Sequence, residues 1–222
     1  MTSIMTFQLG NGNQRIIIGD TQHTYYSSTC ENSKIFPLKD NLLIFCGSGN
    51  DRIIDGINTR IVSIDDLDFC SDKIIKFKED DFEGKFALQD LDGEVRLKEI
   101  HGTQFMIFDS KTLDGKKITN NIPKSVGNIE IIGSGGEFVG LITDSLDSLY
   151  ELDFNDENKE TILISILESF CMLGRQDSAT GHPAIFKLEG YLMEKDKIPR
   201  KIEIKFKHNI KILENYEYEV EE

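Results

Sequence analysis

The chain has 222 residues, 39% of them hydrophobic, which is enough to bury the core of one large domain. Its 39 acidic and 25 basic residues give a formal net charge of −14, which disfavours sequence-independent binding to nucleic acid or to an anionic membrane. No apolar run approaches the roughly 18 residues of a membrane-spanning helix, and the N-terminal segment lacks a basic-then-apolar signal pattern. We therefore expect one domain over residues 1–222, located in the cytoplasm.

The thiols and imidazoles give no sign of a metal or redox site. The four cysteines are far apart in the sequence and form no CxxC pair, which predicts free structural thiols: Cys30, Cys46, Cys70 and Cys171. The four histidines lack metal-binding spacing. We expect no metal and no cofactor, and no histidine-based catalytic triad.

The first quarter of the chain is predicted to form strands. Strands are expected over 2–9 and 14–20, joined by "GNGN", because glycine and asparagine accept the positive φ of tight turns. Two more strands are expected over 33–38 and 41–47. A helix is predicted over 51–61, where the isoleucines of "DRIIDGINTRI" fall on one face. Residues 64–100 are charged and poorly periodic, and their structure is left unassigned.

The second half of the chain alternates between predicted strands and helices. "TQFMIFDS", "KKITN" and "IEIIGSG" read as strands, and helices are expected over 136–151 and 158–174. The second helix carries apolar residues on one face after a polar start. "PAIFKLEG", "KIEIKFK" and the polar tail return to strands. This order predicts an α+β fold in which helices pack outside two antiparallel sheets.

A threonine lies directly behind the initiator methionine. Its small side chain permits routine removal of Met1, so the mature chain would begin at Thr2 with a hydroxyl and a free α-amine on one residue. The hydroxyl is a poor nucleophile unless a base takes its proton, and an α-amine with a pKa near ~8 can act as that base at neutral pH.

Such an amine must be neutral to accept a proton. A nearby lysine ammonium would favour the neutral amine, and carboxylates would be needed to hold that lysine. Asp20 closes the apolar run "RIIIGD", and Lys34 lies in "SKIFPL" on the next strand, so both are candidates. Taken by themselves, these two residues are better explained as a strand end and an ordinary surface charge.

Six segments, in order along the chain, resemble the proteasome β-subunit and HslV peptidase family of N-terminal nucleophile hydrolases. They are "TSIMTFQL", "IIIGDTQ", "SKIFPL", "FCGSGND", "IIGSGGEFVGLI" and "GRQDSATGH", and they extend from residue 2 to residue 182. Each segment alone is a weak match to the family. Six matches in the family's order are not expected by chance. The resemblance implies an αββα four-layer sandwich of two antiparallel sheets flanked by helices.

The resemblance also implies roles for individual residues. Thr2 would be nucleophile and base, with Asp20 and Lys34 in its charge network. It implies that Ser134, Asp177 and Thr180 form a hydrogen-bonding group around the α-amine. Thr180 stands where the family usually has serine. The backbone N–H of Gly47 would stabilise the oxyanion. Substrate-binding positions would be Thr24, Phe45 and Gly49.

Phe45 would form the floor of the pocket for the side chain that precedes the cleaved bond. A phenylalanine there would give a shallow, uncharged pocket that favours small or medium apolar side chains. An ordinary core phenylalanine on a buried strand is an equally good interpretation of this position.

Two departures from the family pattern bear on these roles. Thr2 lies two residues farther from Asp20 than the family's nucleophile does, so strict spacing would put the unreactive Ile4 at that position. An insertion of two residues at "GNGN" preserves strand register, whereas an odd insertion would reverse the side chains. The family's long second helix would also fall in 64–100, where this chain has Gly84 and Gly93 and little periodicity.

The function implied is a threonine endopeptidase that assembles as a homo-oligomeric ring. Its partners would be polypeptide substrates, further copies of itself and an ATP-dependent unfoldase, with no nucleic acid and no membrane. Two alternatives stay open. One is a catalytically inactive structural ring subunit of the same fold, and the other is an amidase that acts on small amides.

Overall fold

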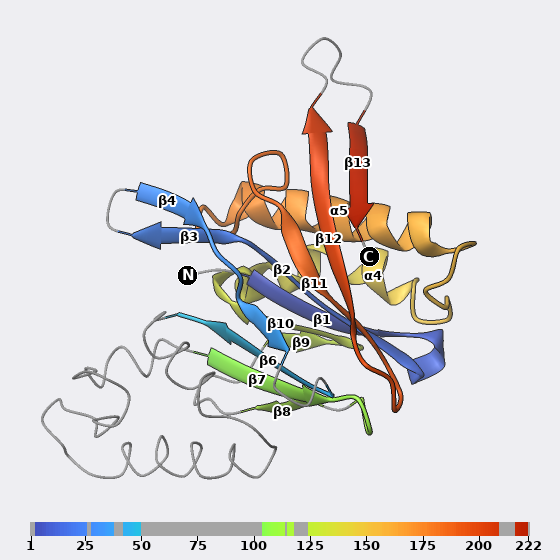
Figure 1. Cartoon of the computed structure of the whole chain (residues 1–222). Coiled ribbons are helices and arrows are strands. Elements are labelled where there is room, and N and C mark those ends of the chain that lie inside the picture. The colour runs from blue at the N-terminus through green and yellow to red at the C-terminus, as the bar shows by residue number, and fades with distance from the viewer. Residues whose placement is uncertain are drawn as a thin grey trace, which may run out of the picture.

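The computed structural model describes residues 3–25, 28–37, 42–49, 104–113, 115–117, 124–208 and 216–221 (Figure 1). Four sequence-based expectations lie outside this part of the chain. They are the placement of Thr2, the helix over 51–61, the unassigned segment 64–100 and the free thiol of Cys70.

A seven-stranded sheet dominates the fold, and every strand in it pairs antiparallel with its neighbours. Its strands, in spatial order, are β13 (Tyr216–Glu221), β12 (Arg200–His208), β11 (Leu188–Glu194), β2 (Gln14–Asp20), β1 (Ser3–Leu9), β10 (Ile129–Gly133) and β9 (Lys124–Val126). β1 and β2 are therefore central strands, and their polar ends come to lie inside the protein.

A second, four-stranded antiparallel sheet lies below the first in the view of Figure 1. Its strands are β5 (Ile35–Pro37), β6 (Leu43–Ser48), β7 (Gln104–Asp109) and β8 (Gly115–Lys117), in that spatial order. A separate hairpin of β3 (Gln22–Tyr25) and β4 (Ser28–Glu31) connects the end of β2 to the start of β5.

The predicted hairpin between the first two strands is confirmed. The turn is a short 3-10 segment, η1 (Gly10–Gly12), and Ile4 pairs with Gly19 while Leu9 pairs with Gln14. Asn11 has φ 54° and Gly12 has φ 87°, the left-handed region that glycine and asparagine tolerate best. The turn residues therefore fix the register that places Asp20 beside the start of β1.

The helices differ in part from expectation. α5 (Lys159–Gln176) matches the helix predicted over 158–174. The single helix expected over 136–151 is wrong: the chain forms a 3-10 helix, η3 (Ser134–Leu141), followed by one short α-helix, α4 (Thr143–Asp147). Gly135, Gly136 and Gly140 explain the difference, because glycine is a poor helix former.

The strand expected from Pro183 onward begins later. Residues 183–186 form a turn and a bend, and β11 starts only at Leu188. Pro183 has no N–H to donate to a sheet ladder, and Ile185 is 74% exposed rather than buried. The apolar letters of "PAIF" therefore do not describe a buried strand.

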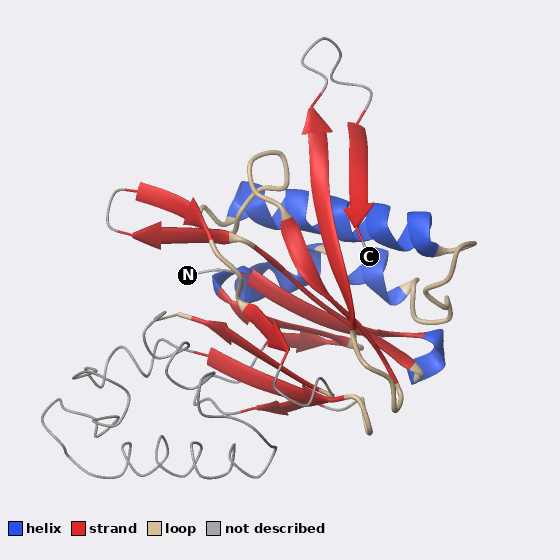
Figure 2. Ribbon diagram, viewed as in Figure 1, coloured by secondary structure: helices blue, strands red, loops and turns tan. Residues whose placement is uncertain are grey.

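The fold is α+β and layered, with helices on one face of the larger sheet and the smaller sheet on the other (Figure 2). Met5 and Phe7 face the helices and pack into a core with Ile166 and Phe170 of α5. Ile4 faces the opposite way, into a second core between the sheets that contains Ile35 and Cys46. Side chains along β1 thus alternate between the two cores, as the two-residue period of a strand requires.

Candidate active site

A buried ion pair lies at the end of β2. Lys34 Nζ is 2.9 Å from Asp20 Oδ1, and the two side chains are 3% and 0% exposed. Such burial is costly for both charges unless each has hydrogen-bonding partners. Asp20 has these partners, because its carboxylate also accepts the backbone N–H of Ser3 on Oδ2 at 2.9 Å and that of Gln22 on Oδ1 at 2.9 Å.

A second polar cluster lies on the helix side of the same strand end. Ser134 is the first residue of η3, and its Oγ donates to Asp177 Oδ2 at 2.5 Å. Asp177 is the C-cap residue that follows α5, and Thr180 Oγ1 donates to the same carboxylate oxygen at 2.8 Å. The Ala179 N–H donates to Asp177 Oδ1 at 3.0 Å and closes the turn around the carboxylate.

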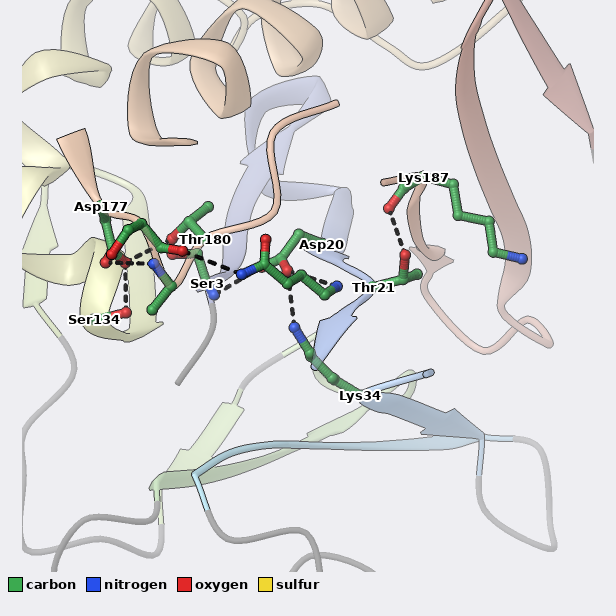
Figure 3. Close-up of polar contacts among 11 residues, drawn as sticks. Ser3, Asp20, Thr21, Lys34, Ser134, Asp177, Thr180 and Lys187 are labelled. Carbon is green, nitrogen blue, oxygen red and sulfur yellow. Dashed lines mark hydrogen bonds and ion pairs between the residues drawn. The ribbon is translucent and has the colours of Figure 1, made fainter. Parts of the chain in front are cut away.

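Ser3 joins the two clusters (Figure 3). Its backbone N–H is bonded to Asp20, and its hydroxyl lies 2.5 Å from Thr180 Oγ1. Ser3 is fully buried, and Gly135 lies against it so closely that a Cβ on Gly135 would be 1.9 Å from the Ser3 oxygen. Five side chains expected from the sequence are therefore gathered at the start of β1: Asp20, Lys34, Ser134, Asp177 and Thr180.

Residues that the sequence interpretation missed hold this arrangement together. Gln22 Nε2 donates to the Ser178 carbonyl at 3.1 Å and so joins the end of β2 to the turn that follows α5. Gly181, in the same turn, lies against Asp20 and Gln22, where a side chain would collide with both. Thr21 donates its hydroxyl to the Lys187 carbonyl at 3.1 Å (Figure 3). In the sequence, Gln22 could have been identified as a site residue only from its place in the "GDTQ" segment. Ser3 and Gly181 are identified as site residues only by their contacts with residues that are distant in the chain.

The expected oxyanion donor is already engaged. The Gly47 N–H donates to the Lys34 carbonyl at 3.1 Å as part of the pairing between β5 and β6. An oxyanion at Gly47 would have to displace or share this bond. Gly49 lies two residues farther along the chain, with φ 132°, a conformation that favours glycine.

The structure gives Phe45 the surroundings of a core residue. Its side chain is fully buried, and its ring stacks on Phe36 with a centroid distance of 6.2 Å. Its neighbours on β6, Ile44 and Cys46, face the core between the sheets, so Phe45 is directed to the opposite face of the strand. Thr24 lies on β3 opposite Thr29. Thr2, the predicted nucleophile, is outside the described residues.

The described cysteines are free thiols: Cys30, Cys46 and Cys171. Burial raises the pKa of the Cys46 thiol far above its usual range, so it stays protonated and unreactive at neutral pH. Burial also raises the pKa of Cys171. Within the described ranges, no group of three or more histidine, cysteine or acidic residues is arranged to hold a metal ion.

Solved structures share this fold. One is eukaryotic HslV from Trypanosoma brucei, with 16% identity, a TM-score of 0.52, and coverage of 86% of this chain and 99% of that one. The Anbu (Gly-1) mutant from Hyphomicrobium sp. strain MC1 has 12% identity and a TM-score of 0.52, with 91% and 86% coverage. BPH from Thiobacillus denitrificans in complex with epoxomicin has 10% identity, a TM-score of 0.52, and 88% and 100% coverage.

These similarities show that the chain shares the layered fold of HslV and of the other two solved structures, which is the fold that the sequence resemblance predicted. Identities this low carry the fold and not the activity. No protein-family model matches the chain, and no curated protein matches its sequence. None of the helices in the described ranges is long and apolar enough to span a membrane.

Proposed function

We propose that the protein is a threonine peptidase in which Thr2, exposed by removal of Met1, is both nucleophile and base. The observation that carries this proposal is the buried Asp20–Lys34 pair, which is bonded to the backbone of Ser3, the residue after Thr2. A buried ammonium is expensive to maintain at a purely structural position, and beside an α-amine it would favour the neutral, basic form.

The alternation of side chains along β1 supports Thr2 rather than a neighbouring residue. Ile4 packs with Ile35 in the core between the sheets, and Lys34 directly precedes Ile35 in the chain. If the strand continued to residue 2, its two-residue period would direct the Thr2 side chain to the same side as Ile4, toward the smaller sheet. Ser3 is directed to the helix side, and its hydroxyl is bonded to Thr180. The "GNGN" insertion would thus leave the nucleophile in register.

The proposed reaction begins when the α-amine of Thr2 takes the proton from the Thr2 hydroxyl. The oxygen attacks the peptide carbonyl carbon, and the resulting oxyanion is stabilised by a backbone N–H of the β6 end, with Gly47 and Gly49 as the two candidates. The protonated amine then gives its proton to the leaving nitrogen, the C–N bond breaks, and an acyl ester remains on Thr2. Water hydrolyses this ester by the same proton transfers in reverse.

We further propose that the protein self-associates into rings that enclose the site and admit unfolded polypeptide. Analytical ultracentrifugation of the purified chain tests the assembly, and a monomer at working concentrations would contradict it. An ATP-dependent unfoldase as partner remains a prediction from the resemblance.

The activity is tested first by the mass of the mature protein and by peptide-amide hydrolysis. We expect a chain that begins at Thr2, and a loss of at least about 1,000-fold in kcat/KM for Thr2→Ala with the fold retained. Intact Met1 together with full activity would contradict the mechanism. Epoxomicin, the ligand of the Thiobacillus denitrificans neighbour, serves as an independent probe that should raise the melting temperature of wild type but not that of Thr2→Ala.

Lys34→Ala gives the second test. We expect a loss of about 100-fold or more in kcat/KM, because the ammonium beside the amine is gone and Asp20 is left without its buried partner. The matched control is Lys197→Ala. Lys197 also makes an ion pair, with Glu194 at 3.1 Å, but its side chain is 65% exposed, so its removal should leave kcat/KM unchanged. Equal activity of the two variants would remove Lys34 from the mechanism.

A further inference from the structure

The hydroxyl protons of the second cluster can be assigned from its hydrogen bonds. Ser134 Oγ and Thr180 Oγ1 both donate to Asp177 Oδ2. A hydroxyl carries one proton, so Thr180 has none left for its 2.5 Å contact with Ser3. Ser3 must therefore be the donor in that contact. The chain of hydrogen bonds runs in one direction, from Ser3 to Thr180 to Asp177.

This direction leaves Thr180 Oγ1 and Ser134 Oγ as hydrogen-bond acceptors only. Each hydroxyl donates its single proton to the Asp177 carboxylate, so any further hydrogen-bonding partner of either oxygen has to be a donor. An α-amine offers N–H donors and keeps one lone pair for the proton of its own hydroxyl. Acceptor-only neighbours would thus bind its hydrogens and leave its basic lone pair unoccupied.

Ser3 is held rigidly enough to impose this order. Its N–H is fixed on Asp20, its side chain is fully buried, and the missing Cβ of Gly135 leaves the space that its hydroxyl occupies. The Ser3 nitrogen also belongs to the peptide bond that joins Thr2 to Ser3, so its hydrogen bond to Asp20 restrains one atom of that bond.

We propose that Ser3 is a positioning residue for the Thr2 nucleophile. By donating to Thr180, Ser3 keeps the Thr180 hydroxyl donating to Asp177, and this leaves the lone pair of the α-amine free to act as the base. This inference rests on the proposed function. The charged groups that the structure places around Ser3 are Asp20 at the end of β2, Lys34 before β5 and Asp177 after α5. Removing the Ser3 hydroxyl deletes none of these charges, and the hydroxyl itself contacts Thr180.

The test compares the pH profile of kcat/KM in Ser3→Ala, Ser3→Thr and wild type. Without the Ser3 proton, Thr180 is free to turn and donate to the amine. This would favour the neutral amine and occupy its lone pair. We expect Ser3→Ala to lower the plateau of kcat/KM by about tenfold and to move its acid limb to lower pH, with little change in KM. Ser3→Thr, which keeps the donor, should restore the wild-type limb.

A matched control is Ser169→Ala. Ser169 is also fully buried and its hydroxyl makes one hydrogen bond, to the Ser165 carbonyl at 2.7 Å, but it lies within α5. We expect this variant to lose stability with no shift of the acid limb. An acid limb in Ser3→Ala that coincides with wild type would overturn the inference. If Ser3→Ala does not fold, Ser3→Cys decides, because its weak donor should shift the limb while Ser3→Thr does not.

The two proposals fail in distinguishable ways. If wild type has no activity that depends on Thr2, the proposed function is wrong and the Ser3 inference falls with it. If Thr2-dependent activity is present and the pH profile ignores Ser3, only the Ser3 inference is wrong.

Discussion

At the scale of single residues, Gly181 shows how closely the site is packed. A Cβ at this position would lie 2.8 Å from Gln22 Cβ and 2.9 Å from Asp20 Oδ1. Real Cβ atoms do not approach other atoms so closely, and both neighbours are fixed. Asp20 is bonded to Lys34, and Gln22 is bonded to the Ser178 carbonyl. Added volume at Gly181 therefore has to move the carboxylate that orders the start of β1.

We predict that Gly181→Ala destabilises the fold by about 1–3 kcal/mol and lowers kcat/KM by at least about tenfold. The matched control is Gly140→Ala in η3, because a Cβ there meets nothing within 4 Å and alanine is the better helix former. Urea unfolding and peptide hydrolysis measure the two effects. A Gly181→Ala protein as active as Gly140→Ala would mean that the Asp20 carboxylate tolerates displacement.

At the scale of secondary-structure elements, Glu194 fastens the end of β11 to its surroundings. Its carboxylate accepts Lys197 Nζ at 3.1 Å and Gln14 Nε2 at 3.4 Å, and Arg200 at the start of β12 lies 3.8 Å away. Gln14 in turn accepts the Phe154 N–H at 2.7 Å. The contacts thus connect β11, β12, β2 and the segment before α5.

Burial alone would raise the pKa of Glu194, but the hydrogen bonds from Lys197 and Gln14 and the nearby positive charges hold the pKa below its usual value. A carboxyl group whose pKa is lower in the folded state than in the unfolded state stabilises the protein at pH values above the unfolded-state pKa. This stabilisation is lost as the pH falls through the folded-state pKa. We predict that Glu194→Gln destabilises the protein by less than about 1 kcal/mol at pH 7, since the ion pair between Glu194 and Lys197 is partly exposed.

The difference in stability between Glu194→Gln and wild type should vanish as the pH falls through the lowered pKa of Glu194 in the folded state. Urea unfolding at a series of pH values measures this dependence. A difference that persists unchanged in acid would show that Glu194 acts through packing rather than charge.

Elements with a strong local pattern could be predicted from the sequence, and those shaped by tertiary contacts could not. The β1–β2 hairpin and α5 follow from turn glycines and a periodic apolar face, and both are confirmed. The sequence predicts a strand in place of the turns before β11, because Ile185, which is 74% exposed, looks like a core residue in the sequence alone. Ser3 could not be identified as a site residue, since its partners Thr180 and Gly135 are distant in the chain.

At the scale of the whole molecule, Arg15 joins the two sheets. It belongs to β2 of the larger sheet, yet its Nε donates to the Leu113 carbonyl, beyond β7 of the smaller one, at 2.7 Å. Its guanidinium lies over the Phe108 ring of β7, 5.3 Å from the centroid, and its Nη1 donates to Thr6 Oγ1 at 3.1 Å. Because Lys34 precedes the smaller sheet and Asp20 ends a strand of the larger one, a shift between the sheets would separate the ion pair of the site.

We predict that Arg15→Met destabilises the protein by about 3 kcal/mol, because buried acceptors lose a charged donor and the cation–π contact is removed. Arg15→Lys should recover only part of this, since a single ammonium cannot reproduce the planar fork. The control is Arg200→Met, whose side chain is 47% exposed and whose loss should cost less than about 1 kcal/mol. Hydrogen exchange gives the decisive measurement: amides of β6 and β7 should lose more protection in Arg15→Met than those of β11 and β2. Equal loss across both sheets would mean that Arg15 stabilises the core in general and does not hold one sheet to the other.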